Sequence, residues 1–517
     1  MIYVIGSGPA SVSACAALVA SGNKVTVLDV GNELPASQIT LRDRLARVEP
    51  EEWASEDIAQ LKNATEATTK GVANKLVLGS DFAYRDSKEA APLSFNSAIM
   101  RRSFALGGLS NVWGACIARY PESELKRWPI TTSELNKHYD AALKLIPGSQ
   151  YKTTSNDDKP EAVSRQALIL LQALRKNQSQ LQAHGVRFGT SRLAVDFHGD
   201  QSSQGPCRQC GLCLYGCPYQ LIYSASQTLT SLRESGLVQY LRGLRVKRLE
   251  SRGDATLIVT EDLKSNQTRE FTGKRVYVGA GVIETARLML ESMNRQGQSL
   301  AIKHSDKFTL PMLQYRATAG VLTERLHTLS QVFLEIDDRE LDKNKIHLQA
   351  YTYNDLFLRA LKRKSGALFP ILKFPIRKLL ERLVICFGYL HSDISSTVRM
   401  KIKSGSNDIE LSGEPNPASR HAAKLAARKL RRVHRLLQGV ATLPTIGIPG
   451  EGNHCGSTFP MSRAPKSMET DPLGRVPGFP RVHLIDASIF PSLSAATITL
   501  TSMANAHRIA SATADWD

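Results

Sequence analysis

The feature that most constrains this chain is a glycine turn between a strand and a helix close to residue 1. Residues 2–5 are mostly β-branched or aromatic, and Gly6-Ser-Gly8-Pro-Ala-Ser11 then leads into an alanine-rich stretch. A second apolar stretch, residues 24–29, follows and ends in Asp29. Strand, helix and strand in this order predict a βαβ unit, which belongs on a parallel sheet.

This turn predicts a dinucleotide site. Gly6 permits a tight turn, and Gly8 lets the backbone approach a pyrophosphate at the helix N-terminus, where unpaired N–H groups favour negative charge. Asp29 stands 23 positions after Gly6 and can accept a hydrogen bond from a ribose hydroxyl. The alternative is a βαβ unit that binds nothing. Ser11 replaces a third glycine and slightly weakens the expected helix–strand packing.

Two further glycine turns occur along the chain. Residues 105–114 place Gly107 and Gly108 beside a polar pair and a tryptophan, so the backbone can pass close to a planar ring. Residues 275–290 have the pattern of a strand, a glycine turn and an amphipathic helix. This second crossover predicts that the sheet begun near residue 1 receives strands from distant parts of the chain.

Length and charge narrow the class of protein. At 517 residues the chain predicts two or three domains, and 66 Lys and Arg against 48 Asp and Glu give a net charge of +18, which favours anionic partners. Nucleic acid is not expected, because no helix-turn-helix or RNA-recognition motif occurs. No apolar run approaches the roughly 20 residues that span a bilayer, and the first residues leave no room for a secretory signal. A cytoplasmic setting is therefore the expectation.

Four motifs near the end of the sequence point to a family. They are Asn453-His-Cys-Gly-Ser-Thr-Phe-Pro-Met461, Asp471-Pro-Leu-Gly-Arg-Val476, Val482-His-Leu-Ile-Asp-Ala-Ser-Ile-Phe-Pro491 and Thr499-Leu-Thr-Ser-Met-Ala-Asn-Ala-His-Arg508. In order and spacing they resemble the closing motifs of the glucose–methanol–choline (GMC) oxidoreductases. The three glycine turns and residues 128–135 fit the same family, and the resemblance is weakest over residues 300–445.

The resemblance implies an α/β fold with two parts. One is a Rossmann-like FAD-binding domain that is discontinuous in sequence, from residues 1–150, 200–300 and 446–517. The other is an inserted substrate-binding domain with an antiparallel sheet, from residues 151–199 and 301–445.

The resemblance also assigns residues to the FAD. The ADP half would be held by Gly6, Ser7, Gly8 and Asp29, with Val246 presenting its backbone to the adenine. The isoalloxazine side would be held by Gly108, Ser110, Asn111 and Trp113, and Asp486 and Ala487 would lie by the pyrophosphate and the ring edge.

The implied chemistry is oxidation of a CH–OH group by hydride transfer to the flavin, with a protein base taking the hydroxyl proton. The substrate would be a sugar, a polyol or a lipid-linked alcohol. His454 matches the family's catalytic histidine, and an imidazole suits proton abstraction near neutral pH. The family usually has a second His or Asn, but this alignment leaves Thr497 or Ala495 there. Thr497 is either an orienting hydroxyl or a helix cap.

A cysteine run is the second unusual feature. Cys207, Cys210, Cys213 and Cys217 follow the spacing C-x2-C-x2-C-x3-C-P, which is that of bacterial ferredoxins. The run predicts an iron–sulfur cluster, 4Fe-4S or 3Fe-4S, with zinc or structural cysteines as alternatives. With a cluster, a dehydrogenase would pass electrons to a quinone, ferredoxin or cytochrome. Without one, the chain would be an oxygen-using oxidase, or an electron-transfer flavoprotein at the membrane that lacks alcohol chemistry.

A basic amphipathic stretch occupies residues 356–384, with Pro370 and Pro375 expected to break it into short pieces. Such a stretch can lie in a membrane interface, so peripheral contact with the inner membrane face is one expectation. The alternative is a solvated helix face that packs on the substrate domain. A second basic helix is expected over residues 420–435.

Overall fold

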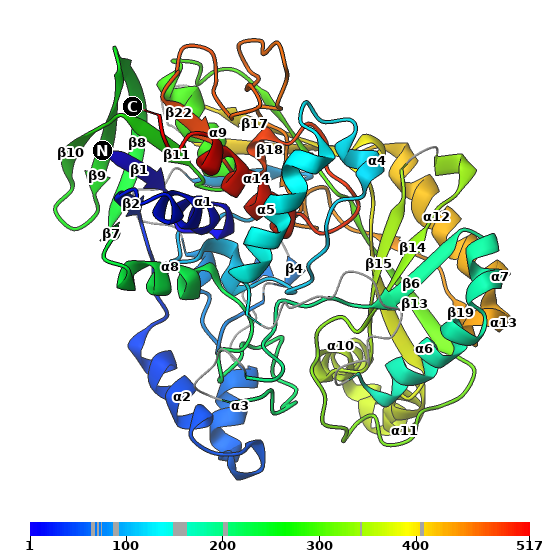
Figure 1. Cartoon of the computed structure of the whole chain (residues 1–517). Helices are drawn as coiled ribbons and strands as arrows, with labels where there is room; N and C mark the ends of the chain where they lie inside the picture. Colours follow the sequence, from blue (N-terminus) through cyan, green and yellow to red (C-terminus); the bar gives the residue numbers. More distant parts are fainter. Residues whose placement is uncertain are drawn as a thin grey trace.

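The computed structural model describes residues 1–63, 68–69, 72–73, 75–85, 92–147, 163–199, 205–341, 344–403 and 408–516. The domain boundaries predicted near residues 150 and 200 fall at or within the gaps between these ranges. The described chain forms two lobes, and the N- and C-terminal ends lie near each other on one of them (Figure 1).

The first lobe is built on a five-stranded parallel sheet. Its strand order is β22 (Val482–Leu484), β11 (Arg275–Val278), β1 (Ile2–Ile5), β2 (Val25–Asp29) and β7 (Val238–Arg242). Strands from the beginning, the middle and the end of the chain therefore lie side by side, as the second crossover predicted. The Rossmann-like organisation is confirmed.

Helices cover this sheet. α1 (Pro9–Ala20) packs against α14 (Thr499–Ala512), which also contacts α5 (Thr132–Lys144) (Figure 1). α8 (Ala225–Glu234) lies beside α1, and α9 (Val282–Ser292) packs on a separate antiparallel sheet. That sheet contains β8 (Leu244–Arg252), β9 (Ala255–Asp262) and β10 (Gln267–Gly273). The N-terminus of α1 is thus held at the carboxyl edge of the parallel sheet.

The second lobe contains a seven-stranded antiparallel sheet. Its strands are β19 (Gly439–Ala441), β13 (Lys307–Gln314), β16 (Leu383–Tyr389), β15 (Ile346–Tyr351), β14 (Val332–Ile336) and β6 (Val186–Thr190), with β20 (Thr445–Ile446) paired to β13. One face packs on α6 (Arg165–Lys176) and α12 (Pro417–Arg432). The expected antiparallel substrate-domain sheet is therefore confirmed.

A third sheet joins segments from both predicted domains. It runs β21 (Cys455–Gly456), β12 (Leu300–His304), β17 (Thr397–Ile402), β18 (Ile409–Glu414) and β5 (Leu93–Asn96). β17 and β18 belong to the range predicted for the substrate domain, whereas β5 belongs to the range predicted for the FAD domain. The exact division into domains stays a prediction.

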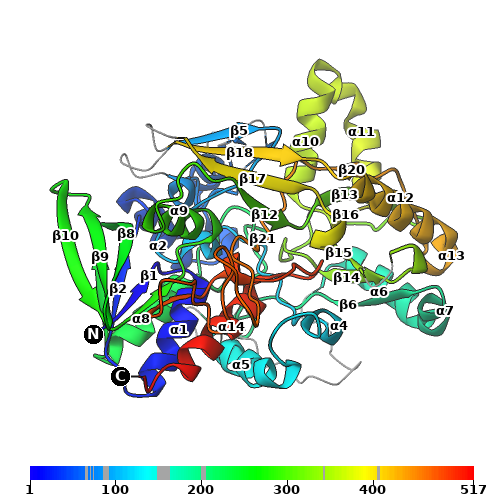
Figure 2. The ribbon, with the colours of Figure 1, turned by 90° about the horizontal axis from the view of Figure 1, so that it is seen from above.

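Two helical pairs extend from the body. α2 (Ala36–Ala46) and α3 (Ser55–Asn63) extend from the first lobe, and α10 (Asp355–Ser365) and α11 (Phe369–Leu380) form a hairpin that projects between β15 and β16 (Figure 2). The remaining helices and strands are α4 (Glu122–Leu125), α7 (Gln178–Ala183), α13 (His434–Leu437), β3 (Thr68–Thr69) and β4 (Val72–Ala73). Within the described ranges, none of these helices has the length and apolarity needed to cross a bilayer.

Candidate functional site

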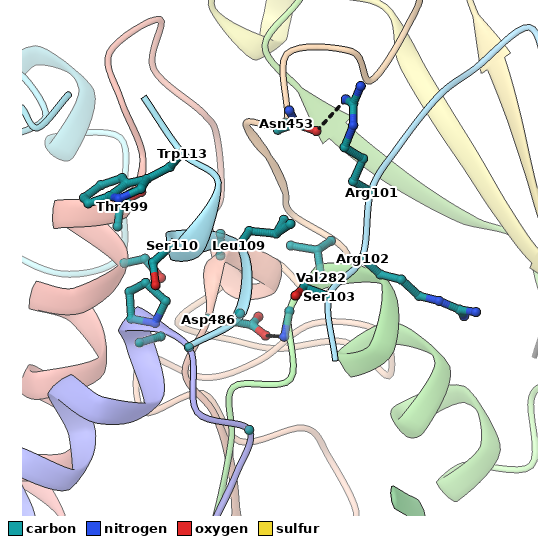
Figure 3. A pocket seen from close by; sticks show the side chains of 18 of the residues that line it. Arg101, Arg102, Ser103, Leu109, Ser110, Trp113, Val282, Asn453, Asp486 and Thr499 are labelled. Carbon is teal, nitrogen blue, oxygen red and sulfur yellow. Dashed lines mark hydrogen bonds between the residues drawn. The ribbon is translucent and has the colours of Figure 1, made fainter. Parts of the chain in front are cut away.

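Most of the residues predicted to bind FAD or to act on the substrate line one cavity of about 460 Å³. Its wall combines the glycine turn after β1, the loop at residues 101–116, the start of α9 and the segment before α14. The face of the antiparallel sheet that does not pack on helices completes the wall through β15 and β16. Figure 3 shows Ser110 and Trp113 on one side of this cavity, with Asp486 and Val282 below and Arg101 bonded to Asn453 across from them.

The first glycine turn leaves space in front of α1. Gly6 has φ +92°, and a Cβ there would lie 2.7 Å from the carbonyl oxygen of Gly279. Gly8 is the N-cap of α1 and receives no side-chain cap, and a Cβ added to it would meet nothing within 4 Å. The helix N-terminus therefore faces open space with its N–H groups unpaired, which fits a pyrophosphate. Ser11 does not loosen the packing, because its buried hydroxyl donates to the Gly279 carbonyl at 3.2 Å.

Asp29 is held at the end of β2 by two hydroxyl donors. Ser7 donates to its carboxylate, and Tyr240 donates to the same oxygen at 3.1 Å. Burial raises the pKa of Asp29 to about 6, against the opposing effect of these hydrogen bonds. Ser7 also accepts the backbone N–H of Gly107 at 3.0 Å, so one hydroxyl joins the first turn to the second glycine loop. The turn, the helix end and the buried acid together fit the ADP half of FAD.

The loop at residues 105–114 is braced mainly from within. Ser110 donates to the Gly107 carbonyl at 2.5 Å and accepts the N–H of Ala225 at 2.9 Å. The Trp113 indole donates to the Tyr223 carbonyl at 2.9 Å. Gly108, Ser110 and Trp113 line the cavity.

Asn111 has a different place from the one implied by the resemblance. It is not part of the cavity wall. Its side-chain amide donates to the carbonyls of Leu106 and Gly108, at 2.9 and 2.7 Å, and its oxygen accepts the Ser224 hydroxyl at 3.1 Å. Asn111 therefore shapes the loop.

Asp486 connects the turn and helix of residues 279–290 to its own segment, residues 482–491, through hydrogen bonds. One carboxylate oxygen accepts the N–H of Gly281 at 2.9 Å and the Thr285 hydroxyl at 2.6 Å, and the other accepts the N–H of Ser488 at 2.9 Å. Burial raises the pKa of Asp486. Asp486 and the adjacent Ala487 both line the cavity.

Sequence reasoning did not identify a buried ionic cluster beside the cavity. Glu284 in the first turn of α9 accepts Arg102 at 3.0 Å and Arg287 at 2.7 Å, and all three side chains are at most 5% exposed. Arg287 also donates to the carbonyl of Val246 at 2.8 Å and thereby fixes the predicted adenine contact. The spacing of three positions between Glu284 and Arg287 could have predicted an ion pair on one helix. No local pattern could have predicted that Arg102, 182 positions from Glu284, joins them.

His454 lies against the cavity at the start of the third sheet. Its ring stacks on Tyr389 of β16, with centroids 4.7 Å apart and planes 24° apart. Burial, followed by the nearby His347 and Lys307, lowers the pKa of His454 to about 4. Among the described residues, its buried Nδ1 has no hydrogen-bond partner. The imidazole is therefore neutral at neutral pH and can accept a proton.

Thr497 lines the same cavity just before α14. That helix begins at Thr499 with Ile498 as its N-cap and no side-chain cap, so Thr497 does not cap it. Its buried hydroxyl has no partner within the described part of the chain. Ala495 is also buried but does not line the cavity.

The cavity wall on the second lobe is aromatic and polar. Tyr351, Phe387 and Tyr389 line it together with Gln349. Lys307 places its ammonium 4.5 Å from the centre of the Phe387 ring and pairs with Glu451 at 3.2 Å. Flat apolar rings with a few polar groups suit a small organic alcohol.

The four cysteines of the predicted cluster lie close enough to one another to interact electrostatically. They are free and half-buried, and burial raises the pKa of Cys217 to about 12. The buried Lys75 lies near Cys213 and Cys217, and burial lowers its pKa to about 8. No group of three or more His, Cys, Asp or Glu side chains in the described ranges, which include this run, is arranged to hold a metal ion. The side-chain positions therefore do not support the predicted iron–sulfur cluster, which stays a proposal.

Comparisons with known proteins agree on the fold and the family. A family model described as GMC oxidoreductase matches residues 18–302, and a second GMC oxidoreductase model matches residues 417–506. No curated protein gives a significant match. The solved structure of pyridoxine 4-oxidase from Mesorbium loti is similar, with a TM-score of 0.60, 14% sequence identity and coverage of 98% of each chain. At that identity the structural similarity supports the fold alone.

Proposed function

This chain belongs to the GMC oxidoreductase family, and from that premise we propose that it oxidises a sugar, a polyol or a lipid-linked alcohol with His454 as the base. The coarser activity follows from the family: the enzyme is an FAD-dependent oxidoreductase that acts on CH–OH groups. The cavity geometry supports the finer assignments of residues and substrate class.

One observation carries the proposal. Two polar side chains, His454 and Thr497, face the cavity that contains the dinucleotide turn, and each has a buried polar atom with no partner among the described residues. Leaving such atoms unpaired costs about 1–3 kcal/mol each, so they are retained where a ligand can pair with them.

FAD supplies the hydride acceptor when it is bound. The protein binds it through the N-terminus of α1, where Gly8 leaves room, and through Asp29. Asp486 accepts the Gly281 N–H and the Thr285 hydroxyl, and these two bonds hold the start of α9 close to the opposite side of the cavity.

The protein's own step is the transfer of a proton. The substrate hydroxyl donates its proton to an imidazole nitrogen of neutral His454, while the Thr497 hydroxyl holds the substrate oxygen in place. Stacking on Tyr389 keeps the imidazole plane fixed. The aromatic wall of β15 and β16 packs against the substrate and excludes water.

The route by which electrons leave is a separate proposal. An iron–sulfur relay at Cys207, Cys210, Cys213 and Cys217 rests on their spacing alone. In the cluster-free alternative, oxygen or an external carrier accepts the electrons. Iron and sulfide analysis of anaerobically purified protein tests the relay, and peroxide release under air tests the oxidase.

The proposed base is tested by anaerobic reduction of the bound flavin. Purified holoenzyme is mixed with sugars, polyols and lipid-linked alcohols, and loss of the oxidised-flavin absorbance is followed. His454→Ala should slow reduction about 10²–10⁴-fold while flavin stays bound. Thr497→Val should have a smaller effect, mainly through KM. His184→Ala is the matched control, because His184 is exposed and outside the cavity.

Two outcomes contradict this assignment. If the flavin of the His454→Ala variant is reduced at the wild-type rate, His454 is not the base. If the wild-type protein retains its flavin and no alcohol reduces that flavin, the result favours an electron-transfer flavoprotein without alcohol chemistry.

A further inference from the structure

The hairpin of α10 and α11 exposes an apolar tip, defined here as residues 366–375. Among the described residues there are eleven exposed large hydrophobic side chains, and four of them lie in this short segment. Ile371 is 77% exposed, Phe374 70% and Leu368 59%. Solvent exposure of large side chains is common singly, but such a concentration marks an interaction surface.

The tip is surrounded by positive charge. Residues 356–380 contain seven Lys and Arg and no Asp or Glu. Lys362, Lys373 and Lys378 are exposed, and the Lys378 ammonium lies 5.8 Å from the centre of the Phe374 ring. Lys362, Arg363, Lys364 and Lys373 lie in or beside the tip, whereas Lys378 lies nearer the base and pairs with Glu381 at 3.0 Å.

The base of the hairpin is fixed to the body. Asp355 at the start of α10 pairs with Lys62 at 2.7 Å and accepts the Tyr215 hydroxyl at 3.1 Å. Ile376 and Leu380 of α11 are buried at its other end, against the residue cluster that includes Leu313. The hairpin is thus a supported projection from the body (Figure 2), and the large apolar side chains at its end are exposed.

We propose that this tip inserts into the interface of an anionic lipid bilayer. The tip is the exposed end of a projecting hairpin, so its apolar side chains can enter a soft surface without a shape-matched partner. Apolar side chains would enter the acyl boundary, and the ring of Lys and Arg would pair with anionic headgroups. Residues 356–380 are cationic and contain no acidic residue, and this charge is complementary to an anionic lipid surface. We therefore take anionic lipid as the partner of the tip.

Docking at this place has a consequence for the cavity. The hairpin is the connection between β15 and β16, and these strands carry Gln349, Tyr351, Phe387 and Tyr389 into the cavity wall. The substrate-facing strands would therefore lie beside the bilayer. Within the proposed function, this position favours a lipid-linked alcohol over a freely diffusing one.

Vesicle flotation tests the proposal with holoenzyme. Vesicles of equal phosphatidylglycerol and phosphatidylcholine should carry the protein, whereas pure phosphatidylcholine should carry much less. The tip variant Leu368→Ser/Ile371→Ser/Phe374→Ser should bind at least about tenfold more weakly. Neutralising two cations, Lys362→Gln/Lys373→Gln, should weaken binding about 25-fold, since each cation near the surface contributes about a fivefold factor.

Matched controls separate the tip from general charge. Leu443→Ser removes an apolar side chain that is 74% exposed outside the hairpin. Arg420→Gln/Lys424→Gln removes two exposed cations from α12. Neither control should change vesicle binding by more than about twofold.

Insertion is read directly with Phe374→Trp. Its fluorescence, corrected for the four native tryptophans, should shift to the blue and be quenched by brominated acyl chains. Flavin content and reduction by a soluble alcohol, measured without vesicles, verify that each variant is folded. These readouts also keep a failure of the docking proposal distinct from a failure of the proposed function.

Three outcomes would overturn the proposal. The first is that wild-type protein does not bind anionic vesicles at low salt. Controls that weaken binding as much as the tip variant would reduce the effect to net charge. A tip variant that changes the oligomeric mass but not vesicle binding would make the tip a contact between copies of this chain.

Discussion

The depressed pKa of His454 predicts an unusually acid-tolerant reaction. Burial, followed by His347 and Lys307, lowers that pKa from its ordinary value of about 6.5 to about 4. The neutral imidazole is the form that takes the hydroxyl proton, so activity is retained above the pKa and lost as the pH falls through it.

The size of the effect follows from these two values. At pH 5 an imidazole with a pKa of about 4 is about 90% neutral, whereas one with a pKa of about 6.5 is about 3% neutral. Between pH 8 and pH 5 the rate of flavin reduction should therefore fall by only about 10%, against a fall of about 30-fold for an unperturbed histidine.

A second variant tests the cause. Lys307 lies close enough to His454 to lower its pKa, and it pairs with Glu451 at 3.2 Å. Lys307→Met removes the cation and leaves the carboxylate, so the acid limb of the rate should move to higher pH. Anaerobic stopped-flow reduction, measured from pH 4 to pH 8 with flavin retention checked at each pH, gives both profiles. An acid limb near pH 6.5 in the wild-type holoenzyme would refute the reasoning.

Three further changes have defined outcomes. Glu284→Ala removes the carboxylate that Arg102 and Arg287 share, while Arg287 keeps its pair with Glu291 at 2.6 Å. The free energy of unfolding should fall by about 3 kcal/mol, measured by chemical denaturation, and a change under about 1 kcal/mol would contradict the buried cluster. Gly6→Ala places a Cβ 2.7 Å from a backbone oxygen at φ +92° and should yield protein with little flavin, whereas Gly22→Ala, also at positive φ but with open space, should retain it. Asp29→Ala should weaken FAD binding about tenfold or more in a reconstitution titration, and unchanged affinity would remove Asp29 from the ribose site.

The sequence was sufficient for the parallel sheet because its signals are local. The turn from Gly6 to Gly8 is encoded by residues that are adjacent in the chain, and Asp29 follows at a fixed distance along one βαβ unit. His454 and Asp486 were found through motifs in which neighbouring residues identify each other. The structure brings these four positions to one cavity, although they come from opposite ends of the sequence.

The remaining features depend on contacts that no local pattern encodes. Arg102 meets Glu284 across 182 positions, and the third sheet joins β5 to strands more than 300 residues later. The cysteine spacing matched a ferredoxin run, but spacing in the sequence does not fix the relative positions of the sulfur atoms, and no metal-binding group was found among the described residues. Asn111 fits the family position in sequence, yet its amide is used by its own loop.

The strand order of the parallel sheet also determines when the sheet can be completed during translation. β1 and β22 belong to the same sheet but are separated by almost the whole chain. At about 5–20 residues per second, a ribosome needs roughly half a minute to a minute and a half to make the segment between them. During that interval β1 and β2 can pair, but Asp486 has not yet reached Gly281. Stable capture of the flavin must therefore follow translation of the closing motif, and the nascent protein needs protection from aggregation until then.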